Sequence, residues 1–155
     1  MCGHFFDFGL ETGLLSFNVK GRKVKIFDDG EIRWSATTLA TIGTAVVRVL
    51  QKEEETRNRM LYIQSFCVTQ NEVLRSLMKM TGKDWQIERV SSDGFIKEIK
   101  KETDRNPKND EARKALVGVV GILESNWEGK KDFANSLLGL ENEDLDQVVK
   151  EVVSR

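Results

Sequence analysis

The stretch Lys23-Val-Lys-Ile-Phe-Asp-Asp-Gly-Glu-Ile-Arg-Trp34 decides the fold class, because its pattern is that of β-structure. Apolar residues alternate with lysines in its first half, and the alternation resumes at Ile32 and Trp34. A two-residue period is typical of a strand with one buried face. Asp28-Asp29-Gly30 has the chemistry of a tight turn. We therefore expect residues 21–36 to form a β-hairpin.

Beyond this stretch, helical patterns alternate with single short strands. Thr37-Thr38 are candidate N-caps for a helix to Leu50, and Thr69-Gln-Asn-Glu72 is a capping box that opens a second helix, which Gly82 can end. The inner face of the first helix is expected at Leu39, Ile42, Val46, Val49 and Leu50. Further strands are expected at 60–63 and 85–90, and further helices from about 92 to 103, 110 to 124, and onward from a cap at Asn142. The class is therefore mixed α and β.

The composition excludes several classes of function. Lys and Arg number 24 and Asp and Glu 25, so the net charge of −1 gives no long-range attraction to nucleic acid or to anionic membranes. Cys2, Cys67 and the single histidine, His4, are too few for a four-ligand zinc site. The low cysteine content, with no signal-peptide pattern and no apolar run of membrane-spanning length, predicts a cytoplasmic protein.

The sequence gives little support for any of the common catalytic residue arrangements. A Ser-His-Asp triad would depend on His4 near the terminus, and no G-x-S-x-G turn is present. Asp28-Asp29 could chelate a divalent cation, but a turn is the commoner use of such a pair. Tyr62 has Phe66 four residues later where a lysine would lower the pKa of its phenol, so reductase chemistry from Tyr62 is not expected. We assign no catalytic or metal-binding residue.

The glycines do not form a phosphate-binding loop. Neither G-x-G-x-x-G nor G-x-x-x-x-G-K-[ST] occurs, and Gly118-Val-Val-Gly121 lies inside an apolar helical stretch. Such loops supply the converging backbone N–H groups that hold a pyrophosphate. We therefore expect that the chain alone binds no cofactor.

The N-terminal segment is where function competes with structure. Four large apolar residues, Phe5, Phe6, Phe8 and Leu10, lie beside glycines. Such residues either fill a core or line a pocket for a small apolar or aromatic ligand. We predict all four as substrate-binding residues and keep core filling as the alternative.

Several runs resemble the NmrA-like, isoflavone-reductase-like family of atypical short-chain dehydrogenases. The resemblance rests on the order and spacing of His4-Phe-Phe-Asp-Phe-Gly-Leu-Glu-Thr-Gly13, Lys25-Ile-Phe-Asp-Asp-Gly30, Trp34-Ser-Ala-Thr-Thr-Leu-Ala-Thr-Ile-Gly43, Thr56-Arg-Asn-Arg59, Tyr62-Ile63, Thr69-Gln-Asn-Glu72, Thr81-Gly-Lys-Asp-Trp85 and Leu137-Leu-Gly-Leu-Glu141. It implies a Rossmann domain that binds NADP or NAD, followed by a smaller C-terminal domain that shapes the substrate cleft. The match covers the C-terminal half only, and the dinucleotide fingerprint and catalytic lysine of the family have no counterpart here.

The resemblance implies a single domain over 1–155 of α/β class, the C-terminal substrate-domain portion of a Rossmann-type protein. Residues 1–20 would border the cleft, 21–36 would form the hairpin, and 37–155 would supply helices with isolated strands. We expect a truncated oxidoreductase-family protein without autonomous catalysis, acting as a regulatory or ligand-binding module. The alternative is the substrate-domain component of an NAD(P)-dependent reductase completed by a Rossmann partner. Because strand 60–63 would lack neighbours, we expect a protein partner or a homo-oligomer to cover it.

Overall fold

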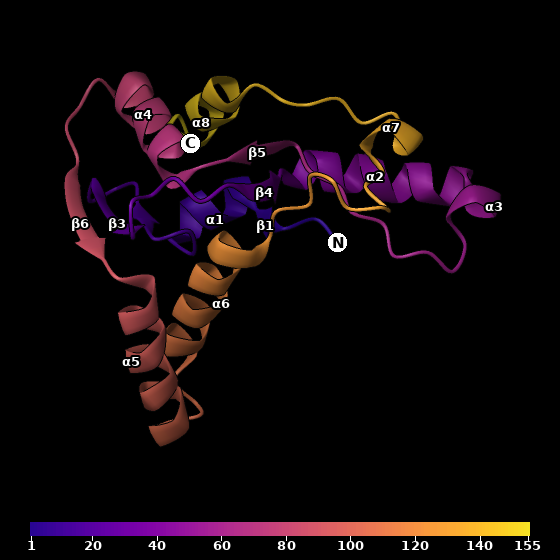
Figure 1. The fold of residues 1–155 in the computed structure, drawn as a ribbon. Coiled ribbons are helices and arrows are strands. Elements are labelled where there is room, and N and C mark those ends of the chain that lie inside the picture. The colour runs from indigo at the N-terminus through magenta and orange to yellow at the C-terminus, as the bar shows by residue number, and fades with distance from the viewer.

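A computed structural model describes residues 1–155 as two small three-stranded sheets surrounded by helices (Figure 1). The first sheet has the order β1-β4-β5, with strands His4–Phe5, Trp34–Thr37 and Phe66–Val68. The second has the order β2-β3-β6, with strands Phe17–Asn18, Lys23–Phe27 and Gln86–Val90. β1 runs parallel to β4 and β3 parallel to β6, while β5 and β2 are antiparallel to their neighbours. The predicted mixed class is confirmed.

Eight helices accompany the sheets. They are α1 (Phe6–Thr12), α2 (Leu39–Gln51), α3 (Glu53–Thr56), α4 (Gln70–Thr81), α5 (Ser92–Arg105), α6 (Asp110–Glu124), α7 (Asn135–Leu138) and α8 (Leu145–Val153). The capping box of α4 is confirmed, since the Thr69 side chain accepts from Glu72 N and the Glu72 carboxylate accepts from Thr69 N. Gly82 ends α4 with a φ of 62°, in the left-handed region that favours glycine. The last helix is capped by Asp144 rather than Asn142.

The predicted hairpin over 21–36 is wrong, because β3 and β4 belong to different sheets. The turn exists, with Gly30 N donating to Phe27 O at 2.9 Å. β6 covers one edge of β3, and β2 together with the Gln70 side chain of α4 covers the other edge, so β4 has no edge to pair with. The Gln70 Oε1 accepts from Phe27 N at 2.8 Å and its Nε2 donates to Lys25 O at 3.0 Å. The chain therefore leaves the turn toward the other sheet, where Trp34 lies opposite Val68.

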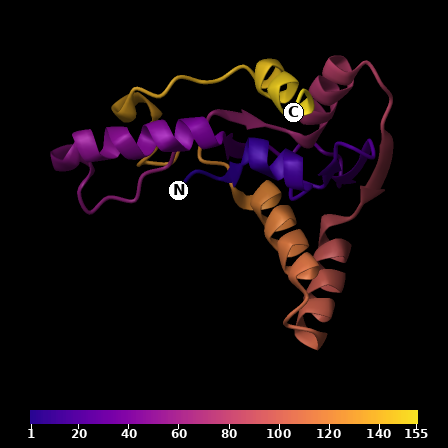
Figure 2. The same ribbon diagram turned by 180° about the vertical axis from the view of Figure 1, so that it is seen from behind.

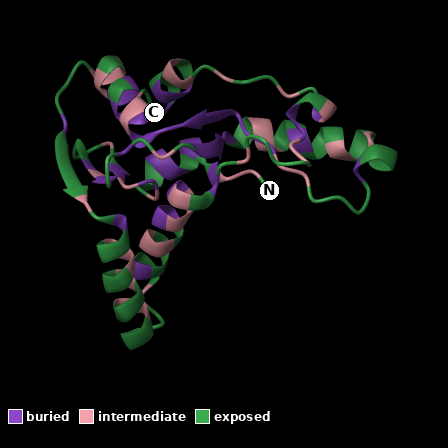
Figure 3. Ribbon diagram, in the orientation of Figure 1, coloured by how far each residue is buried: buried purple, intermediate pink, exposed green.

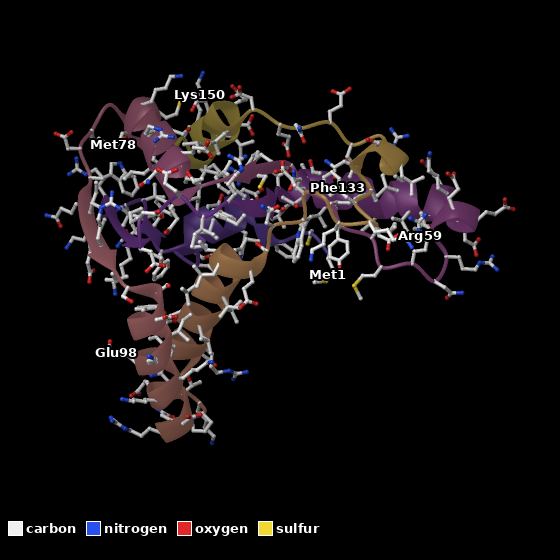
Figure 4. All side chains as sticks on the ribbon, viewed as in Figure 1. Met1, Arg59, Met78, Glu98, Phe133 and Lys150 are labelled. Atoms are coloured by element: carbon white, nitrogen blue, oxygen red, sulfur yellow. The ribbon has the colours of Figure 1, made fainter.

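The predicted strand at 60–63 is also wrong. Tyr62 forms only an isolated bridge with Phe133, and the regular strand of this region is β5. The backbone groups of residues 61–63 are taken by two separate segments, because Met1 N donates to Leu61 O at 2.6 Å and Ala134 N donates to Tyr62 O at 2.8 Å. Figure 4 shows Met1, Arg59 and Phe133 at this end of the molecule.

The predicted inner face of α2 is largely exposed. Leu39, Val46 and Leu50 are exposed, and Ala45 is the one buried residue of the helix. Figures 1 and 2 show α2 extending away from the sheets, and Figure 3 shows it mostly exposed or intermediate. Ile42 and Val49 of the predicted face are half-buried, and Val49 packs against a small apolar cluster that contains Leu138 of α7. The periodicity therefore located an apolar stripe of which the rest of the chain covers only a part.

The main core lies between the two sheets and helices α1, α4, α6 and α8. Its largest fully buried side chains include Trp34, Phe6, Phe17 and Phe27. The last helix contributes Val148, Val149 and Val152. α5 and α6 project together from this body as an arm (Figures 1 and 2). None of the helices has the length and apolar character needed to cross a membrane.

Candidate functional site

The candidate site lies where the parallel strands β1 and β4 end. Their register pairs His4 with Ala36 and Phe5 with Thr37, so both carboxyl ends meet at one edge of the sheet. α1 begins directly after β1, and α2 begins one residue after β4. Ligands of open α/β sheets bind outside the carboxyl ends of the strands. The segment from Phe5 to Leu10 therefore occupies a position suited to a binding site.

The structure divides the four predicted substrate-binding residues into two pairs. Phe6 and Leu10 are fully buried, and the Phe6 ring meets Phe66 edge-on with centroids 4.7 Å apart. Phe5 and Phe8 are 42% and 46% exposed. Positions 6 and 10 are four residues apart and share the inner face of α1. For Phe6 the core alternative therefore holds, while Phe5 and Phe8 can meet a ligand at the strand ends.

Asp7 is the polar residue of this edge that the sequence analysis did not identify. Its carboxylate is buried, with Oδ1 accepting from Phe8 N at 3.0 Å and from Leu39 N at 3.2 Å. It forms no ion pair within the chain and lies at the N-terminus of α2, where the helix dipole stabilises a negative charge. Acidic residues near helix starts are common, so the sequence alone carried no signal for a contact between positions 7 and 39.

A second carboxylate occupies the same helix end. The Thr38 hydroxyl accepts from Thr41 N at 3.1 Å and donates to Glu143 Oε2 at 2.7 Å. The Thr41 hydroxyl donates to the same oxygen at 2.8 Å. Glu143 comes from the loop between α7 and α8, so this cluster ties the C-terminal segment to α2. Two of the first amide groups of α2 are satisfied by the chain's own oxygens, and two carboxylates lie beside them.

A groove of about 1160 Å³ lies elsewhere, between β3, β6 and the C-terminus. Leu10 and Phe17 contribute to its lining, with Lys20 and Lys23 among its charged residues. Phe5 and Phe8 do not line it. The structure therefore does not bring the four predicted residues into one pocket.

His4 is structural in this fold. Its ring is buried, with Nε2 lying 3.0 Å from Gly118 O of α6, and it meets Trp34 edge-on at 5.8 Å. Burial lowers the pKa of His4, and the bond to Gly118 opposes that effect only in part. A Cβ at Gly121 would lie 2.1 Å from Nε2, so this glycine gives the ring its space. The close approach explains why α6 contains glycines that form no phosphate loop.

The structure offers no metal site, since no group of three or more His, Cys, Asp or Glu side chains could hold an ion. Asp28, considered as a chelator, accepts from Ser92 N at 3.0 Å instead, and hydrogen bonding with Ser92 lowers its pKa. Tyr62 lies beside the Trp127 ring, with centroids 5.1 Å apart. Neither residue takes part in the edge formed by β1 and β4.

No protein-family model matches the chain. Among curated proteins it is 41% identical over 91 residues to the oxidoreductase aprR of Aspergillus flavus, a match covering 59% of this chain and 30% of that protein. It is 29% identical over 146 residues to the oxidoreductase poxI of Penicillium oxalicum, covering 90% of this chain and 46% of that protein. The chain thus spans less than half the length of the curated relatives it matches.

Solved structures share the fold at low identity. AtPrR2, solved with NADP+ and (+)-pinoresinol, matches 97% of this chain with 49% of its own, at a TM-score of 0.70 and 19% identity. A nucleoside-diphosphate-sugar epimerase of Staphylococcus aureus matches with a TM-score of 0.61 and 20% sequence identity. The NADPH-dependent quinone oxidoreductase QOR2 of Escherichia coli matches with a TM-score of 0.58 and 14% sequence identity. Each match covers about half of the solved chain, which fits a C-terminal half.

Proposed function

The curated relatives and the solved structures support the NmrA-like, isoflavone-reductase-like family for this chain, and on that premise we propose that it is an oxidoreductase-family fragment without catalysis of its own. In this proposal it acts as a regulatory or ligand-binding module. The observation that carries the proposal is the occupied N-terminus of α2, where Asp7 and Thr38 satisfy amide groups that a phosphate would need.

The electrostatics of this helix end support the same conclusion. A pyrophosphate brought to α2 would meet the carboxylates of Asp7 and Glu143, and like charges at short range oppose each other strongly where water is scarce. Displacing Asp7 would also leave a buried carboxylate without its hydrogen bonds, which costs about 1–3 kcal/mol or more. The dinucleotide that NmrA-like reductases bind therefore has no place on this part of the chain.

Isothermal titration calorimetry with NADPH and with NADH tests the proposal. We expect no saturable heat up to about 1 mM coenzyme, which corresponds to a binding free energy weaker than about −4 kcal/mol. The NADPH-dependent QOR2 of Escherichia coli serves as the positive control. Micromolar binding of either coenzyme to the chain alone would contradict the proposal.

The ligand-binding part of the proposal concerns Phe5 and Phe8. Their exposed rings at the strand ends suit a small apolar or aromatic compound, and an aromatic fluorophore such as anilinonaphthalene sulfonate is a usable probe. We expect the variants Phe5→Ser and Phe8→Ser to reduce saturable probe binding. Val117→Ser, at an exposed apolar side chain on α6 that does not line the groove beside β3 and β6, is the matched control. Equal losses in all three variants would contradict a site at the strand ends.

A second candidate function is the substrate domain of an NAD(P)-dependent reductase completed by a Rossmann partner. It is favoured by the position of β1, an edge strand whose one neighbour is β4, beside the exposed rings of Phe5 and Phe8. A further strand could add to this edge and bring a coenzyme toward the rings. Coexpression with the region of poxI outside the matched part tests this candidate. NADPH binding by a copurified complex would support it, and failure to form a complex would oppose it.

A further inference from the structure

The groove between β3, β6 and the C-terminus is built from parts of the chain that are far apart in the sequence. The end of α1, the hairpin of β2 and β3, the start of β6 and the end of α8 all contribute to its lining. Its volume of about 1160 Å³ is large enough for a small-molecule ligand. No residue of β1, β4 or β5 lines it, so the groove is separate from the strand ends where Phe5 and Phe8 lie.

The inner wall of the groove is apolar. It consists of buried side chains from α1, from the hairpin and from α8, namely Leu10, Phe17, Val24 and Val152. Ile87 also lines the groove, lies beside Val24 in the ladder between β3 and β6, and is 48% exposed. A ligand body that covers Ile87 removes hydrocarbon surface from water, which favours binding.

The two acidic residues of the groove are already paired within the chain. Glu11 forms an ion pair with Arg155, and Glu88 Oε2 lies 4.0 Å from Lys25 Nζ. All four side chains are partly exposed, so each pair is weak, but each carboxylate has a counter-charge beside it. The acidic side chains therefore add no net negative charge to the groove.

Two lysines of the groove have no acidic partner. Lys20 lies in the turn between β2 and β3, and Lys23 is the first residue of β3, so both belong to the same end of the hairpin. Both are exposed, and neither side chain forms an ion pair or a hydrogen bond within the chain. An anionic group can therefore meet both lysines while the rest of the same ligand lies against the apolar wall, which is a complementary arrangement of charge and apolar surface.

We propose that the groove binds a small amphipathic carboxylate, whose anionic group pairs with Lys20 and Lys23 and whose apolar body covers Ile87. Charge selects among ligands of similar shape, because the lysines attract an anion, repel a cation and add nothing to the binding of a neutral hydrocarbon. The proposal goes beyond the function proposed above and does not depend on it, because it involves neither a coenzyme nor the rings of Phe5 and Phe8.

Isothermal titration calorimetry of the full chain with decanoate and with decyltrimethylammonium tests the proposal. The two probes have similar hydrocarbon tails and opposite charges. We expect saturable binding of decanoate with a dissociation constant of about 0.1–1 mM, as its small size implies, and binding of the cation at least about tenfold weaker. Added salt should weaken the binding of decanoate, because it screens exposed charges.

Variants at exposed positions separate the contribution of charge from that of apolar surface. The double variant Lys20→Gln/Lys23→Gln should weaken decanoate binding by roughly three- to tenfold and remove most of the preference over the cation, since each exposed ion pair contributes little. Ile87→Ser should also weaken decanoate binding. Val117→Ser, at an exposed residue of α6 outside the groove, is the matched control and should leave it unchanged. Circular dichroism melts verify that each variant keeps the fold.

Amide chemical shifts of the isotope-labelled chain locate the bound probe directly. Decanoate should shift the amide signals of Gly13, Lys23 and Ile87, which come from three different parts of the groove lining. The proposal is overturned by a lack of saturable decanoate binding up to about 5 mM, by equal affinity for the two probes, or by unchanged binding in the double lysine variant. Shifts confined to the surroundings of Phe5 and Phe8 overturn it as well, and would support the separate site at the strand ends.

Discussion

Truncation of Phe6 and of Phe8 to alanine should have very different effects on stability, although both residues belong to the same aromatic segment. The Phe6 side chain is fully buried and packs on Phe66 and near Trp34. Removing such a ring costs about 3–5 kcal/mol through lost burial and the cavity left behind. Phe8 keeps 46% of its surface in water, so its removal should cost about 1 kcal/mol.

Urea denaturation followed by far-UV circular dichroism measures this difference. Thermal melts give a second measure of the same difference. For a chain of this length, a loss of about 3–5 kcal/mol in the free energy of unfolding lowers the melting temperature by roughly 6–20 °C, and a loss of about 1 kcal/mol lowers it by roughly 2–4 °C. Because Phe6→Ala can leave too little stability to measure, Phe6→Leu provides a milder version with the same sign. Equal losses at the two positions, or a larger loss at Phe8, would refute the division of this segment into one core residue and one surface residue.

Two further predictions concern the contact between β1 and α6. The pKa of His4 is lower in the fold than its ordinary value of 6.5, so the unfolded chain binds a proton more readily. The free energy of unfolding should therefore fall as the pH drops below about 6.5, by at most about 1.4 kcal/mol per pH unit, and level off below the folded pKa. Urea titrations at pH 7.5 and 5 with His4→Phe as reference check this, and an identical pH dependence in the variant would contradict it. Gly121→Ala should destabilise the fold by about 2 kcal/mol or more, because the added Cβ would lie 2.1 Å from the His4 ring. The control is Gly94→Ala in α5, where the added Cβ makes only ordinary contacts. This variant should stabilise the fold by up to about 1 kcal/mol. Thermal melts that show the same change for both glycine variants would count against the close packing at His4.

Only some features of the candidate site could be predicted from the sequence. The sequence located the aromatic segment as a candidate site and the helix start that follows Thr37-Thr38. It could not distinguish Phe6 from Phe8, because both are large, apolar and close to glycines. It also could not find Asp7, whose role depends on Leu39, 32 residues away. That contact satisfies the first backbone N–H group of α2.

What the sequence determined by itself is the set of elements whose causes lie within a few residues. These are the capping box of α4, the left-handed end at Gly82 and the bounds of α6, because caps and helical periodicity are local. What only the tertiary structure decided is which strands pair and which faces are buried. β2 and the Gln70 side chain occupy the edge of β3 that β4 would need, and Leu39, Val46 and Leu50 of α2 stay exposed. Both outcomes depend on residues far apart in the chain, where short-range patterns carry no information.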